Sequence, residues 1–190
     1  ATSTTVSDGG SQGVQNGGVA SDADVKSGGT QTISSGGAAT STKVSNGGSQ
    51  GVENGGQASN TQVSSGGNQT VSSGGTATST TISDGGSQGV KSGGVASDAN
   101  VKSGGTQTIS SGGTANSTTV NDGGSQGVED GGQASYTQVS SGGKQTVSSG
   151  GKATSTTVSD GGSQGVQDGG QASNTQVSSG GKQTVSSGGT

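Results

Sequence analysis

The chain has no histidine, no cysteine and no arginine, and Tyr136 is its single aromatic residue. The lack of His and Cys excludes the usual zinc sites and thiol catalysis. The lack of Arg excludes a bidentate guanidinium clamp for phosphate or carboxylate. A net charge of −4 and one aromatic ring also argue against nucleic acid, which favours basic surfaces and aromatic stacking platforms. We therefore expect no enzyme, no metal, no cofactor and no nucleic-acid partner.

Long apolar runs are also missing, since only 19% of the residues are apolar. No segment approaches the roughly 20 consecutive apolar residues of a transmembrane helix. A signal-peptide pattern and an amphipathic helix are not seen either. We expect no direct insertion of these residues into a membrane.

The chain does contain a strict repeat of 19 residues, without insertion or remainder. Each copy carries two Gly-Gly pairs and two Val or Ile residues at fixed positions. A period close to 20 residues is typical of a solenoid, in which each copy forms one coil. Residues 1–190 are therefore predicted to be a single repeat array, and both ends fall on a repeat boundary, as in a segment of a longer array. The ten coils begin at Ala1, Ala20, Ala39, Ala58, Ala77, Ala96, Ala115, Ala134, Ala153 and Ala172.

Composition alone would favour a different interpretation, because 45 glycines and many Ser, Thr and Asn residues are typical of flexible linkers. The placement of the apolar residues argues against disorder. Every Val or Ile except Val19 and Val95 occupies the sixth or the fourteenth position of its coil. A disordered chain would not require its apolar residues to recur at fixed positions of a repeat.

The spacing within a coil predicts two short strands rather than a helix. Four glycines per coil would each cost a helix roughly 1 kcal/mol relative to Ala. In residues 3–8, alternation places Thr4 and Val6 on one side, and in residues 11–15 it places Gln12 and Val14 together. Each Gly-Gly pair is expected to supply a corner with positive φ.

Stacking of such coils at about 4.8 Å would give a rod of roughly 45 to 50 Å with parallel sheets. The Val and Ile columns, with Ala at the first position and Thr or Ala at the fourth, would form a thin core. The ten glutamines at the twelfth position, from Gln12 to Gln183, are expected to point inward and to bond to one another along the column. The alternative is a row of glutamines that faces outward to bind a ligand.

The carboxylates show no catalytic or calcium-binding pattern. Asp8, Asp84, Asp122 and Asp160 share the corner before the first Gly-Gly pair, but successive members are at least two coils apart, roughly 10 Å. We interpret them as turn residues. The Gly-rich calcium nonapeptide is absent, because Gln12 and Val14 stand where that motif has Gly and Asp.

The repeat V-x-S-G-G-x-Q-x-V-x-S-G-G-x-A-x-x-T, as in Val63 to Gly75 followed by Ala77 and Thr80, resembles that of the self-associating autotransporter adhesins of Gram-negative bacteria. The resemblance covers the whole chain. It implies an all-β fold, a right-handed parallel β-helix of ten coils, that forms part of the extracellular passenger of a protein anchored in the outer membrane. Members promote aggregation, biofilm formation and attachment to host cells. The implied partners are thus the chain itself and a host-cell surface.

Several members of the family are O-heptosylated on serines in the short loops, which implies a glycosyltransferase as a further partner. Here the matching serines precede Gly-Gly; the alternative is that Ser is simply a favourable turn residue. They are Ser27, Ser65, Ser103, Ser141 and Ser179 at the first corner, and Ser35, Ser73, Ser92, Ser111, Ser149 and Ser187 at the second.

Three functions remain open at this point. The first is a surface adhesin repeat region that self-associates and attaches to cells. The second is a purely structural stalk or matrix spacer with no recognition of its own. The third is ice binding, which is weakened because the outward fifth position mixes Thr with residues such as Asp24, Lys43 and Gln62.

Overall fold

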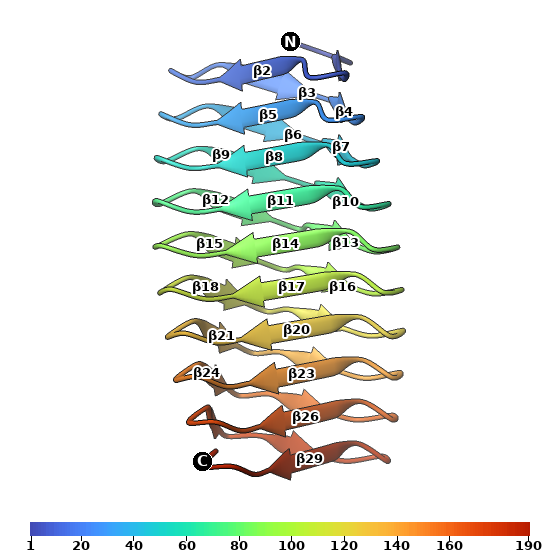
Figure 1. The fold of residues 1–190 in the computed structure, drawn as a ribbon, viewed down its shortest axis with the longest axis vertical. Coiled ribbons are helices and arrows are strands. Elements are labelled where there is room, and N and C mark those ends of the chain that lie inside the picture. The colour runs from blue at the N-terminus through green and yellow to red at the C-terminus, as the bar shows by residue number, and fades with distance from the viewer.

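The computed structural model describes residues 1–190 as one continuous stack of ten coils, with 29 strands and no helix. The chain winds right-handed from one end of the rod to the other, so that its two termini lie at opposite ends (Figure 1). Strands of successive coils pair in parallel and without any shift in register. The predicted all-β solenoid is therefore confirmed.

The first sheet consists of ten short strands around the sixth position of each coil. Each strand has an outward residue followed by an inward Val or Ile, as at Thr81 and Ile82, and this residue is buried in every coil except the last, where Val177 is exposed. The strands are β1 (Thr5–Val6), β4 (Asp24–Val25), β7 (Lys43–Val44), β10 (Gln62–Val63), β13 (Thr81–Ile82), β16 (Asn100–Val101), β19 (Thr119–Val120), β22 (Gln138–Val139), β25 (Thr157–Val158) and β28 (Gln176–Val177).

The second sheet has ten strands of four residues each, and it carries the inward Gln and the second Val or Ile. In β14 the exposure alternates, with Gln88 and Val90 buried and Ser87 and Gly89 half-buried. The strands are β2 (Ser11–Val14), β5 (Thr30–Ile33), β8 (Ser49–Val52), β11 (Asn68–Val71), β14 (Ser87–Val90), β17 (Thr106–Ile109), β20 (Ser125–Val128), β23 (Lys144–Val147), β26 (Ser163–Val166) and β29 (Lys182–Val185).

A third sheet shows that the prediction of two strands per coil was wrong. Its nine strands span the boundary between repeats, and only the central Ala of each faces the core. One small apolar residue in three gives little periodic signal. The strands are β3 (Val19–Ser21), β6 (Ala38–Thr40), β9 (Gln57–Ser59), β12 (Thr76–Thr78), β15 (Val95–Ser97), β18 (Thr114–Asn116), β21 (Gln133–Ser135), β24 (Lys152–Thr154) and β27 (Gln171–Ser173).

The core consists of two apolar ladders with a polar ladder between them. One cluster joins the second Val or Ile column to the Ala column, as at Val90 and Ala96. A second cluster includes Ile82 and Val101 from the first column and Ala99 from the fourth position. Both columns and the Ala column were predicted to face inward, and the structure confirms this.

The two glycines of each pair have different roles, which the sequence prediction did not separate. At the first corner of coil six, Ser103 and Gly104 both have positive φ, 49° and 77°. Two successive left-handed residues form a type I′ turn, and the amide of Gly105 closes it on the carbonyl of Lys102 at 2.8 Å. Gly105 itself is absent from the positive-φ residues. It is needed because a Cβ there would overlap with the carbonyl of Ile82 in the coil before.

Candidate functional site

The glutamine column is the most regular polar feature of the interior. In all nine steps, the Nε2 of one Gln donates to the Oε1 of the Gln in the coil before, at 2.6 to 2.8 Å. The glutamines from Gln31 to Gln164 are no more than 1% exposed. The ladder satisfies amides that would otherwise be costly to bury, so it is structural. The alternative of an outward ligand-binding row is wrong.

Threonines at the fourth position complete this ladder. Thr118 Oγ1, for example, donates to Gln107 Oε1 at 3.3 Å. In coil six the fourth position is Ala99, and Gln88 Oε1 therefore accepts only from Gln107 Nε2, at 2.7 Å, among the side chains. The sequence predicted that Thr lies in the core, but not that it donates to Gln.

The eleven serines before Gly-Gly are brought into two rows along the edges of the rod. Every one of them is exposed and has positive φ. In every coil but the last, the amide of the corner serine is already used: the amide of Ser65, for example, donates to the carbonyl of Asp84 in the next coil at 2.9 Å. In the first row, serines recur at every second coil, about 9.6 Å apart. The structure thus presents these hydroxyls to solvent at regular intervals.

The aspartates of the first corner stay apart from one another. Asp84 is exposed and has φ of 49°, and the Ser83 hydroxyl donates to its Oδ2 at 3.0 Å. Ser65 and Ser103 occupy the same corner in the coils on either side. No group of three potential metal ligands comes together in the structure. The interpretation of these aspartates as turn residues agrees with their conformation.

A third corner, at the third position of each coil, was missed by the sequence analysis. It has positive φ in every coil although no coil has Gly there. Ser, Asp and Asn supply most of these residues, and Tyr136 does so in coil eight with φ of 56° and 64% exposure. Asn and Asp tolerate this region best, which is the weak signal that could have found the corner.

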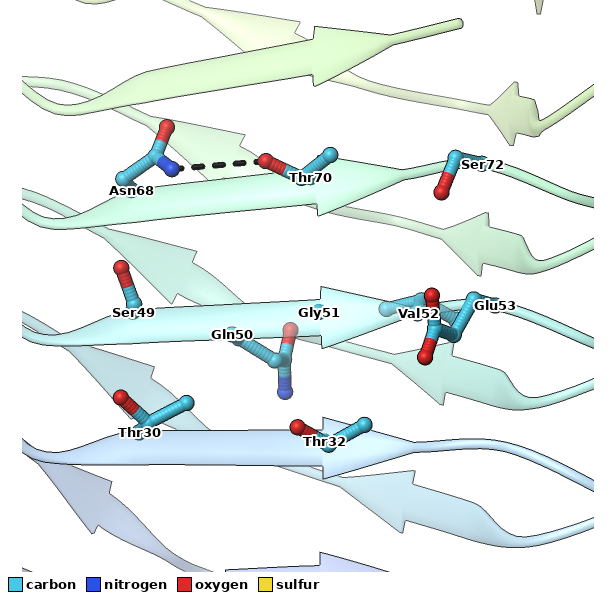
Figure 2. Close-up of a pocket in the computed structure, with 10 residues that line it drawn as sticks. All are labelled: Thr30, Thr32, Ser49, Gln50, Gly51, Val52, Glu53, Asn68, Thr70 and Ser72. Carbon is cyan, nitrogen blue, oxygen red and sulfur yellow. Dashed lines mark hydrogen bonds between the residues drawn. The ribbon is translucent and has the colours of Figure 1, made fainter. Parts of the chain in front are cut away.

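The outward surfaces of the sheets are polar and only shallowly hollowed. A hollow of about 280 Å³ lies on the second sheet at Gly51, between Thr32 and Thr70 (Figure 2). A second, of about 570 Å³, lies on the first sheet between Gln62 and Lys102 and has no apolar lining residue. No helix with the length and hydropathy of a membrane span is present. The candidate functional site is therefore an extended surface rather than an enclosed pocket.

Comparison of the sequence with protein-family models assigns the chain to a family. Residues 1–48, 44–86 and 115–162 match a family model described as "Adhesin of bacterial autotransporter system, probable stalk". The chain belongs to this adhesin stalk family. The resemblance inferred from the repeat is thereby confirmed.

A solved structure supports the same assignment for this adhesin stalk. The chain is similar to a crystal structure of a hyper-glycosylated TibA fragment, whose glycosylation was catalysed by TibC. The two are 44% identical, the alignment covers 100% of this chain and 76% of the other, and the TM-score is 0.81. A search of curated proteins finds no match. The assignment to the adhesin stalk family thus rests on both a sequence model and a shared fold.

Proposed function

We propose that the chain is a non-enzymatic stalk segment, displayed on the bacterial surface, that associates with copies of itself and attaches to host cells. The observation that carries this proposal is the match of the repeat to the adhesin stalk family, together with the 44% identity to TibA. Its outward faces are polar and sparsely charged, with a net charge of −4 over 190 residues, so two copies repel each other little. Repeated weak contacts along a rod add up to useful avidity.

Concentration-dependent association of the purified chain is the expected result. Sedimentation velocity from low to high micromolar concentration should show a shift from monomer to dimer or larger species. A monomer at every concentration would contradict homotypic association and favour the purely structural spacer. Beads coated with the chain should bind to cultured host cells more than beads coated with an unrelated β-solenoid, and equal binding would contradict attachment.

We further propose that the corner serines accept O-linked sugar, heptose in the first instance, from a glycosyltransferase. Their exposure and the regular separation of their rows support this, as does the glycosylated state of the TibA fragment. Coexpression with a bacterial heptosyltransferase should add up to eleven sugars by intact mass. Peptide mapping should locate them on serines such as Ser65 and Ser103. Strand serines such as Ser87, which donates to Asn68, should stay unmodified, and sugar mainly on strand serines would contradict the proposal.

A further inference from the structure

The outward face of the second sheet alternates in height along the rod. At its thirteenth position every odd coil has Gly and every even coil has Thr. Because the strands pair in register, Gly51 lies directly between Thr32 and Thr70. Like residues then recur at every second coil, about 9.6 Å apart. We call this surface the comb face; its ridges are Thr32, Thr70, Thr108, Thr146 and Thr184, and its gaps are Gly13, Gly51, Gly89, Gly127 and Gly165.

The gaps of the comb face are open spaces. The hollow of about 280 Å³ lies at Gly51, with the Thr32 and Thr70 side chains on the flanking strands (Figure 2). A Cβ built on Gly51, Gly89 or Gly127 would meet nothing within 4 Å. Each gap therefore has room for a side chain from another molecule.

We propose that the comb face docks against the comb face of a second copy, with the rods antiparallel and the Thr ridges of each copy in the Gly gaps of the other. This inference rests on the homotypic association proposed above. A second copy is the partner that brings ridges at the same spacing as the gaps. Shape complementarity of this kind allows two sheets to pack closely.

The order of the coils allows two antiparallel copies to interlock along all ten coils. When coil one faces coil ten and coil five faces coil six, every even coil lies opposite an odd coil. Thr108 of one copy then enters the gap at Gly89 of the other. A parallel pair without offset places Thr opposite Thr and keeps the sheets apart. A parallel pair could interlock only after a shift of one coil, and that shift removes the two-fold axis. The antiparallel pair interlocks and keeps a two-fold axis, as in most homodimers.

The charges at the edges of the comb face fit the same arrangement. They occupy the eleventh and fifteenth positions, and in the antiparallel pair each charged side chain meets a serine. No like charges are opposed, and hydroxyls are available as partners. The pairs are Glu53 with Ser148, Lys91 with Ser110, Glu129 with Ser72, Lys144 with Ser49, and Lys182 with Ser11.

A triple substitution that fills the gaps tests the proposal. Gly51→Thr, Gly89→Thr and Gly127→Thr should weaken association at least tenfold by sedimentation velocity. The fold should persist, since the even coils already carry Thr in this column. The matched control places three threonines on the outward face of the first sheet, at Gln62, Asn100 and Gln138, and should change association less than twofold. Thermal melts of both variants by circular dichroism should match that of the original chain.

Spin labels test the orientation of the two copies. Each label can be attached at a single introduced cysteine, because the chain has no cysteine of its own. Single Ser35→Cys and Ser111→Cys variants place labels at the rim of coils two and six. In the antiparallel dimer the Ser35 labels should be separated by about seven coils, or 34 Å, along the rod, and the Ser111 labels by about one coil. Double electron–electron resonance with short distances at both sites would overturn the antiparallel arrangement.

The outcomes separate the two proposals. If the original chain is monomeric throughout, homotypic association fails and the comb-face inference fails with it. If the original chain associates and the gap-filled variant associates equally well, only the comb-face inference is overturned. If the control variant loses association instead, the docking surface is the first sheet.

Discussion

Replacing Gly105 with alanine is expected to divide the solenoid at coil six. The added Cβ would overlap with the carbonyl carbon and oxygen of Ile82 and lie 2.9 Å from the amide nitrogen of Ser83. These are backbone atoms, so the two coils must separate to accommodate it. We expect a loss of roughly 3 kcal/mol, because forced overpacking typically costs up to that amount. Since stability in repeat arrays depends on neighbouring coils, the thermal melt should start earlier and broaden into two transitions.

Gly89→Ala is the matched control for this prediction. It adds the same methyl group at a glycine of the neighbouring coil, but nothing lies within 4 Å of the added Cβ. Gly89 is also absent from the positive-φ residues, so Ala meets no backbone strain there. We expect a change within about 0.5 kcal/mol by urea unfolding. Equal destabilisation by the two substitutions would mean that the contact between Gly105 and Ile82 does not limit how closely the coils stack.

The sequence predicted the main ladders of this fold because their residues repeat without exception. The two Val and Ile columns, the Ala column and the Gln column all face inward as expected. In a solenoid with a strict period, residues at the same position of successive repeats lie above one another. An alternation seen in one repeat therefore predicts a column along the whole rod. The Gln ladder could be predicted because a buried amide needs a partner and its own copies supply it.

What the sequence could not predict depends on contacts between coils or on weak local preferences. The third strand has one inward Ala and variable flanks, as in β18, so neither periodicity nor β-propensity marked it. The third corner uses Ser, Asp, Asn and Tyr136 rather than Gly. The second glycine of each pair reflects a close approach that becomes visible only when coils are stacked. The comb face was also missed, because the alternation of Gly and Thr at the thirteenth position becomes a surface feature only when the coils are stacked.

Replacing Gln107 with glutamate should make the stability of the solenoid depend on pH. Gln107 is fully buried, accepts from Gln126 and Thr118, and donates to Gln88 at 2.7 Å. A carboxylate keeps the two acceptor contacts but leaves Gln88 Oε1 without its donor. We expect a loss of about 3 to 5 kcal/mol at pH 7, the range for an uncompensated buried charge.

Protonation should reverse much of this loss. Burial raises the pKa of the introduced carboxyl in the folded state above its unfolded value of about 4.3. The folded state therefore holds its proton more tightly, and the destabilisation is small below that pH and grows as the pH rises above it. The protonated carboxyl can again donate to Gln88 Oε1. Urea unfolding at pH 4 and pH 7, compared with the original chain and with Thr106→Glu at an exposed site nearby, measures the effect. A loss of stability that is the same at both pH values would contradict a tightly closed Gln ladder, because a hydrated carboxylate titrates alike in the folded and unfolded states.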